Sequence, residues 1–134
     1  HRFDVDERYA YMSTEMEGYI GNILVIFDVS DPLKPTEVSR WWMPGQHLAG
    51  GEQPTWEGYK NRLHHAMRVG DELWASVWHA GFRVIDVSDI SQPKTVASHD
   101  YHPPIPEPTH TVMPVEARTI APSAPKSRLP DPWP

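Results

Sequence analysis

The fold is decided by two copies of one pattern, IFDVSDPLKPTEVSR (residues 26–40) and VIDVSDISQPKTVAS (residues 84–98). The copies align without a gap and agree at six positions, four of them consecutive: Asp28/Asp86, Val29/Val87, Ser30/Ser88, Asp31/Asp89, Pro35/Pro93 and Val38/Val96. Similarity at a fixed spacing is the signature of repeat architectures, in which one supersecondary unit recurs along the chain. The sequence therefore predicts a repeat protein.

The repeat extends toward the N-terminus of each copy. HRFDVDERYAYMSTE (residues 1–15) corresponds to HAMRVGDELWASVWH (residues 65–79), and the first copy then carries an insertion, EGYIGN (residues 17–22). A third copy begins with HTVMP at His110. Each unit thus begins on a histidine, at His1, His65 and His110.

Each unit predicts four short strands separated by turn residues such as Gly, Asp, Ser and Pro. The expected strands are residues 2–5, 9–14, 23–29 and 36–41 in the first copy and residues 65–69, 73–78, 82–87 and 94–99 in the second. No stretch has helical periodicity beyond a turn or two, which indicates an all-β fold.

Both faces of these strands are apolar. In the first copy Val25, Phe27 and Val29 share one face, and Ile26 lies on the other. A sheet with one solvated side needs apolar residues on one face only. The blade of a β-propeller needs them on both faces, because it packs against a neighbour on each side. A two-sheet sandwich is the competing fold, and it explains less well why the order of histidine, strands and DVSD motif is kept.

The chain is therefore predicted to consist of antiparallel four-stranded propeller blades that form an incomplete ring. The expected parts are a first blade (1–45), a long inter-blade loop (46–63), a second blade (64–101), a linker with the first strand of a third blade (102–115) and an irregular Pro-rich tail (116–134). Because two blades and one strand cannot close a ring, we expect either the remainder of a longer propeller or further copies of the chain as partners.

The motif itself resembles a known family. LVIFDVSDP (residues 24–32) and RVIDVSD (residues 83–89) resemble the LVIVD repeat of bacterial and archaeal β-propeller proteins. The resemblance covers residues 1–114 and implies a propeller of many blades, but it implies no particular activity. A related propeller group, the selenium-binding protein and methanethiol oxidase family, binds metal through histidines, and this chain is similar to it in architecture and histidine usage alone.

Composition excludes several classes of function. The formal net charge of −6 argues against nucleic acid and anionic membranes as partners, and the absence of cysteine excludes disulfides and thiolate ligands. The sequence has no apolar run that could span a membrane and no targeting segment, so we expect a soluble protein of unknown location. Phosphate-loop, nucleophile-elbow and HExxH motifs are also missing, which leaves kinases and common hydrolases without support.

The histidines that begin each unit suggest a metal site. The end of the second strand of a blade returns to the rim where its first strand began, which predicts His65 beside His79 and His1 beside Glu15, with His110 on the same rim. Imidazole and carboxylate ligands suit a transition metal ion such as Fe, Cu, Mn or Zn. The predicted metal ligands are His1, His65, His79 and His110, and Glu15 is a predicted catalytic base or outer-shell residue.

Two functions follow as hypotheses. The first is metal-dependent chemistry, oxidative or lyase-like, on a small organic molecule at the channel mouth, with a pocket built partly by the long loop. The second is a non-catalytic interaction scaffold in which the histidines are structural, as expected for His64 in the blade interface. Asp28 and Asp86 are expected to fix turns, His99 and His102 to lie in turns or at a rim, and the loop aromatics Trp41, Trp42, Trp56 and Tyr59 to wall a pocket or cover a blade.

Overall fold

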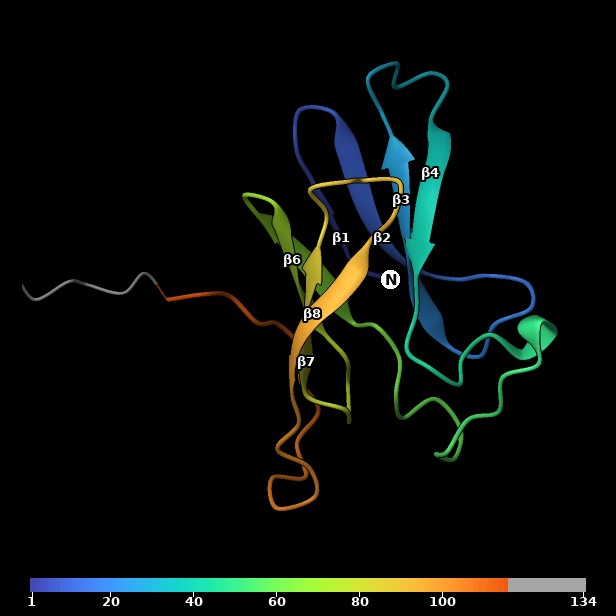
Figure 1. Cartoon of the computed structure of the whole chain (residues 1–134), viewed down its shortest axis with the longest axis vertical. Coiled ribbons are helices and arrows are strands. Elements are labelled where there is room, and N and C mark those ends of the chain that lie inside the picture. The colour runs from blue at the N-terminus through green and yellow to red at the C-terminus, as the bar shows by residue number, and fades with distance from the viewer. Residues whose placement is uncertain (116–134) are drawn as a thin grey trace, which may run out of the picture.

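The structure is a computed structural model that describes residues 1–115. It contains two four-stranded antiparallel sheets and one short 3-10 helix (Figure 1). The first sheet comprises β1 (Phe3–Val5), β2 (Tyr9–Glu15), β3 (Asn22–Asp28) and β4 (Thr36–Trp41). The second comprises β5 (His65–Val69), β6 (Glu72–Ser76), β7 (Phe82–Asp86) and β8 (Lys94–His99), and η1 (Leu48–Gly50) lies in the loop between the sheets.

Both sheets are meanders in which each strand pairs with its neighbours in the sequence. The register shifts at Ile26/Phe27 in the first sheet and at Val84/Ile85 in the second, so the same irregularity recurs just before each DVSD motif. The predicted eight strands and the all-β class are confirmed, and each sheet is one propeller blade.

The third copy forms no strand within residues 102–115, where the structure has only an isolated bridge between Thr109 and Trp78. A strand needs a partner for its backbone hydrogen bonds, and the second strand of a third blade would follow residue 115. The Pro-rich tail predicted at 116–134 lies outside the described residues.

The core lies between the two sheets. The first sheet contributes Tyr11, Leu24 and Ile26, which are all fully buried. The facing side of the second sheet contributes a row of buried aliphatic residues, Ala66, Leu73, Ala75, Val77, Ile85 and Val87. Alternate residues of each strand point to opposite faces, so only one face of each sheet takes part in this core.

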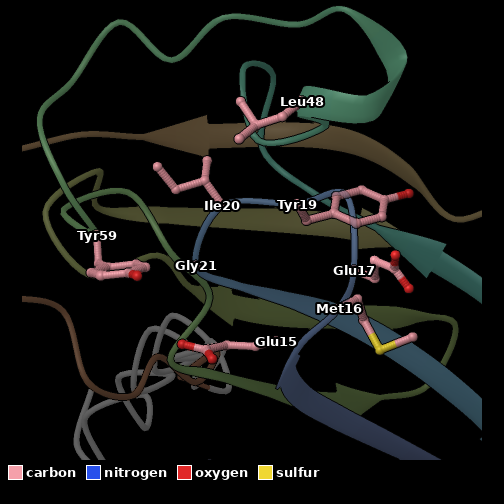
Figure 2. A pocket seen from close by; sticks show the side chains of 8 residues that line it. All are labelled: Glu15, Met16, Glu17, Tyr19, Ile20, Gly21, Leu48 and Tyr59. Atoms are coloured by element: carbon pink, nitrogen blue, oxygen red, sulfur yellow. The ribbon is translucent and has the colours of Figure 1, made fainter.

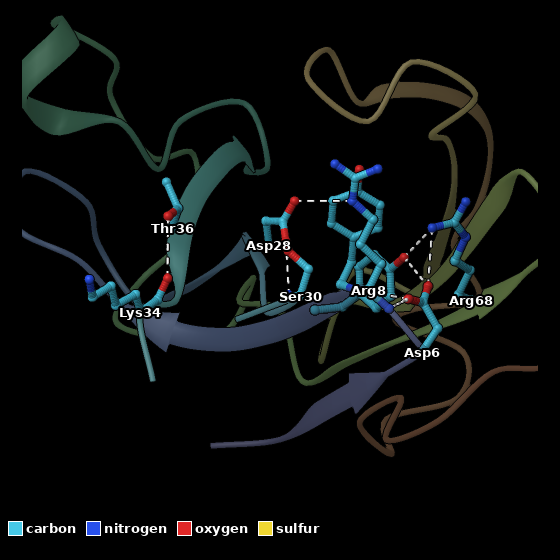
Figure 3. A network of polar contacts seen from close by, with 9 residues as sticks. Asp6, Arg8, Asp28, Ser30, Lys34, Thr36 and Arg68 are labelled. Carbon is cyan, nitrogen blue, oxygen red and sulfur yellow. Dashed lines mark hydrogen bonds and ion pairs between the residues drawn. The ribbon is translucent and has the colours of Figure 1, made fainter. Parts of the chain in front are cut away.

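The innermost strands of the two blades meet at one edge of this interface. The Arg68 backbone N–H of β5 donates to Asp4 of β1 at 2.9 Å, and the guanidinium of Arg68 bonds both Asp6 and the Tyr11 hydroxyl (Figure 3). Burial and the hydrogen bond to Asp6 raise the pKa of Tyr11, so its hydroxyl remains a donor. At the outer edge, the Trp41 indole donates to Thr95 Oγ1 at 2.9 Å. Hydrogen bonds therefore join the blades at both edges.

The aspartates of the repeated motif fix turns, as predicted. Asp28 accepts from the Ser30 backbone N–H at 2.9 Å (Figure 3). In the second blade, Asp86 accepts from the Ser88 N–H at 2.8 Å. Asp28 also accepts from Arg8 Nε at 3.1 Å. These bonds satisfy backbone donors in the tight turn that leads out of β3 and β7.

A serine in the second strand of each blade reaches the chain that follows. Ser13 Oγ donates to the Leu63 carbonyl at 2.8 Å, and Ser76 Oγ donates to the His110 carbonyl at 2.6 Å. Ser13 pairs with Leu24 in β3, and Ser76 pairs with Phe82 in β7, so the two serines hold related places near the rim. The segment around His110 thus docks on the second blade much as the segment around Leu63 docks on the first.

Candidate functional site

One rim of the first blade carries two irregular segments that are fastened to each other. The insertion after β2 (residues 16–21) meets the long loop (residues 42–63) at Gln46, whose side chain is fully buried. Gln46 Nε2 donates to the carbonyls of Ile20 and Asn22 at 2.8 and 3.1 Å, and Gln46 Oε1 accepts from the Met43 N–H at 2.8 Å. Both the nitrogen and the oxygen of this buried amide are therefore bonded to backbone groups of the rim.

The loop is also organised around a carboxylate. Glu52 accepts hydrogen bonds from the N–H groups of Gly45 and His47 at 2.7 and 3.0 Å, and from the Trp42 indole at 3.2 Å. These bonds, led by the one from His47, hold the pKa of Glu52 below its usual value, so it is ionised at neutral pH. The loop therefore has a defined shape although it contains little regular structure.

These two segments border an open pocket of about 480 Å³. Figure 2 shows the eight residues that line it, which come from the end of β2, the insertion and the loop: Glu15, Met16, Glu17, Tyr19, Ile20, Gly21, Leu48 and Tyr59. The volume is within the range of ~300–1,000 Å³ that is usual for small-molecule sites. The long loop contributes Leu48 and Tyr59 to this pocket.

The chemistry of this pocket is acidic and aromatic. Glu15 and Glu17 are both exposed, and Tyr59 is 57% exposed. Tyr19 is less available because its ring stacks on His47 at 4.4 Å and lies beneath Arg40 at 5.7 Å. Two carboxylates and an accessible phenol ring are groups that attract a cation.

The four aromatic residues named for the loop have different roles. Trp41 is buried in the core, and Trp42 packs edge-on against Tyr19 at 5.2 Å. Trp56 lies against Gly45, whose added Cβ would meet the Trp56 ring at 3.0 Å. Only Tyr59 of these four lines the pocket.

A second group of side chains gathers where the blades begin. The ring of His64 lies 4.9 Å from that of His1, 4.8 Å from that of His110 and 5.2 Å from that of Trp78. His64 Nδ1 also donates to the His110 carbonyl at 2.6 Å. The predicted burial of His64 is confirmed at 6% exposure, and burial lowers the pKa of His64, which favours the neutral ring.

Trp78 in this group has an unusual backbone conformation, with φ of 39°. It is held by the tight turn after β6, in which the Ala80 N–H donates to Val77, and by the Thr109 N–H, which donates to the Trp78 carbonyl at 2.7 Å. Residues in the left-handed region store strain and persist only when their surroundings fix them. The guanidinium of Arg62 lies 4.9 Å from the Trp78 ring.

The predicted pairings of His65 with His79 and of His1 with Glu15 do not occur among the described contacts. His65 Nε2 donates to the Phe3 carbonyl at 3.2 Å, while the His79 ring packs on His102 at 5.5 Å in a separate hollow with Lys60. Glu15, the last residue of β2, lines the pocket of the first blade instead. Within residues 1–115 no three His, Asp or Glu side chains are arranged to hold a metal ion.

His99 and His102 lie where turn or rim residues were expected. His99 is the last residue of β8, and His102 follows in a turn in which its Nδ1 pairs with Asp100 at 2.9 Å. His64 and Trp78 were not predicted as parts of a site. Two features of the sequence point to these residues, the adjacent pair His64-His65 and the pair Trp78-His79 in the turn after β6. Within each pair, a shift of one residue decides which ring lies at the rim.

Comparison with known proteins identifies the repeat. A family model described as the LVIVD repeat matches residues 3–42 and 70–100, more than half of the chain. The first match covers the whole of the first sheet, and the second covers β6 to β8. No curated protein sequence and no solved structure gives a significant match. In the part of the chain that the structure describes, no helix is long and apolar enough to cross a membrane.

Proposed function

The chain belongs to the LVIVD-repeat family, and we propose that it is a β-propeller binding protein that takes a small organic cation in the pocket of the first blade. The observation that carries this proposal is that the pocket is built by the EGYIGN insertion, which has no counterpart in the second blade. A rigid repeat scaffold that carries a shaped loop at one rim is a common arrangement for binding.

The contacts of the pocket support a cation rather than an anion. Glu15 and Glu17 would pair with an ammonium group, and the Tyr59 ring would offer its negative face to the same charge. Met16, Ile20 and Leu48 provide apolar surface for the organic part of the ligand. Because the pocket is open to solvent, each charged contact contributes at most ~1 kcal/mol.

Benzylamine, protonated at neutral pH, is a suitable probe, with benzyl alcohol and benzoate as neutral and anionic relatives of similar shape. We expect isothermal titration to detect benzylammonium binding, and Glu15→Gln and Glu17→Gln each to weaken it by about threefold to fivefold, because each substitution removes one carboxylate charge. The affinity should fall as salt is added, since exposed charges are screened.

The control is Glu7→Gln, which removes an equally exposed carboxylate from the β1–β2 turn, at the opposite end of the strand. Benzylammonium affinity should not change in this variant. Equal binding of benzyl alcohol and benzylammonium, or an equal loss in all three variants, would rule out recognition of charge by this pocket.

Metal binding is the second candidate, because the rings of His1, His64 and His110 pack together. In the described structure, these side chains are not arranged to hold a metal ion, so binding would require the rings to turn. The His64 ring lies 4.9 Å from that of His1 and 4.8 Å from that of His110. A transition metal there would be held by imidazole nitrogens, and oxidative or lyase-like chemistry on a small molecule would depend on it. Glu15 is a pocket residue, so its role as a base beside a metal stays a prediction.

We expect His110→Gln to weaken Zn²⁺ binding by more than about tenfold if the histidines are ligands, a loss that even outer-shell changes produce in metal sites. The His110 carbonyl, which anchors His64 and Ser76, is unaffected by this substitution. His99→Gln, at an exposed position of β8, is the matched control. Metal analysis of protein purified without a histidine tag gives the readout, and equal zinc affinity in both variants would leave the histidines with structural roles alone.

A further inference from the structure

The outward face of the first sheet is apolar and open. Ala10, Met12, Phe27, Val29 and Pro35 line a shallow hollow of about 260 Å³, and each is at least partly exposed. Ile23 and Val25 lie on the same face of β3 but are fully buried, so the open area is confined to the end of the sheet that carries these five residues. Five apolar side chains that share one hollow are more than the scattered apolar residues of an ordinary surface.

The repeat shows what kind of surface this face is. Phe27 pairs with Ala10 in the first sheet, as Ile85 pairs with Leu73 in the second, and Phe27 and Ile85 both directly precede the aspartate of the DVSD motif. Ile85 and Leu73 are fully buried because the first sheet packs on them. The open face of the first blade therefore corresponds, position by position, to a face that is covered by a blade in the second.

The outward face of the second sheet is the complementary case. Trp74 pairs with Val84, as Tyr11 pairs with Ile26, and Tyr11 and Ile26 form the face of the first blade that packs on the second. Trp74 and Phe82 remain partly exposed, with their rings 6.0 Å apart. The second blade thus presents an aromatic surface at the positions where the first blade makes its contact.

We infer that a second copy of this chain docks head to tail, with the Trp74 and Phe82 face of one copy against the Phe27 and Val29 face of the next. The occupant follows from continuity with the existing interface, because both open faces are the repeat equivalents of two faces that already pack together. Such a contact is heterologous and forms a closed ring when the rotations add to a full turn. Propellers of about four to eight blades correspond to rings of two to four copies.

Native mass spectrometry of the full 134-residue chain at several concentrations tests this assembly. We expect species of two to four times 15.3 kDa. Phe27→Glu and Trp74→Glu should each shift the midpoint of assembly to at least about thirtyfold higher concentration, since each places a charge at the centre of the contact. Leu33→Glu, in a turn residue that is 88% exposed, should assemble like the parent chain.

Mixing the two variants separates a head-to-tail contact from any symmetric one. The Phe27→Glu chain keeps an intact Trp74 face, and the Trp74→Glu chain keeps an intact Phe27 face, so the mixture should form a dimer through one interface. Circular dichroism of each variant checks that it remains folded. A monomeric parent chain at all concentrations, rings that persist in folded Phe27→Glu, or a mixture that stays monomeric would overturn the inference.

Discussion

Replacement of Gly81 by alanine is expected to lower the free energy of unfolding by about 2–5 kcal/mol. Gly81 has φ of 68°, which costs an L-residue ~1–2 kcal/mol, and an added Cβ would lie 2.0 Å from the His99 carbonyl oxygen. Because that neighbour is backbone of the adjacent strand, β7 and β8 must separate to relieve the clash, at a further cost of ~1–3 kcal/mol. Thermal and urea unfolding measure the change.

Gly70→Ala is the matched control. Gly70 has φ of 60°, almost the same as Gly81, but in the β5–β6 turn no atom lies within 4 Å of the place that an added methyl group would occupy. This variant should lose only the conformational term, about 1–2 kcal/mol. If both variants lose the same amount of unfolding free energy, the close approach of β8 to Gly81 does not contribute to the loss in Gly81→Ala.

Ile85→Ala is expected to cost about 2–5 kcal/mol. Ile85 is fully buried between the two sheets, so truncation removes apolar contact and leaves a cavity that the rigid sheets fill only in part. Leu33→Ala, at a position that is 88% exposed, should change the unfolding free energy by less than about 0.5 kcal/mol.

The same substitution tests whether the two blades unfold together. Ile85 belongs to the second sheet, but the cluster it joins includes Leu24 and Ile26 of the first. Hydrogen exchange of the β2 and β3 amides in Ile85→Ala should therefore accelerate by the same factor as exchange in β6 and β7. Unchanged protection in the first sheet would show that each blade is stable alone.

The strand pattern could be predicted from the sequence because local chemistry determines it. The DVSD aspartates bond the backbone two residues on, and apolar residues on both faces of a strand require neighbours on both sides. Family membership follows from the same motif. The first strand of a third blade does not follow from the motif in the same way, because a strand at His110 also needs a partner strand for its backbone hydrogen bonds, and residues 102–115 supply none.

The candidate sites were harder to predict because they depend on side-chain direction at strand ends. His65 and His79 lie at the predicted rim, but β5 directs His65 toward Phe3, and the tight turn after β6 directs His79 toward Lys60 and His102. The neighbouring His64, one residue out of register, reaches His1 and His110 instead. A change of one residue moves a side chain to the opposite face of a strand.

The pocket of the first blade depends on long-range bonds that no local pattern encodes. Gln46 joins the loop to Ile20 and Asn22, which are more than twenty residues away, and Glu52 gathers three donors from its own loop. Glutamine and glutamate in a loop rich in Gly and Pro are usually solvated. Their roles become apparent only once the insertion and the loop are seen side by side (Figure 1).

The way in which Gln46 and Glu52 fasten the rim also bears on how this protein can change over evolution. Their hydrogen bonds run mainly to the insertion and the loop, whereas the sheets are held by the core between the blades. Selection can therefore alter Glu15, Leu48 or Tyr59, and with them the ligand preference that we propose for the pocket, while the repeat retains its stability. One propeller could in this way acquire different binding specificities in different lineages without a new fold.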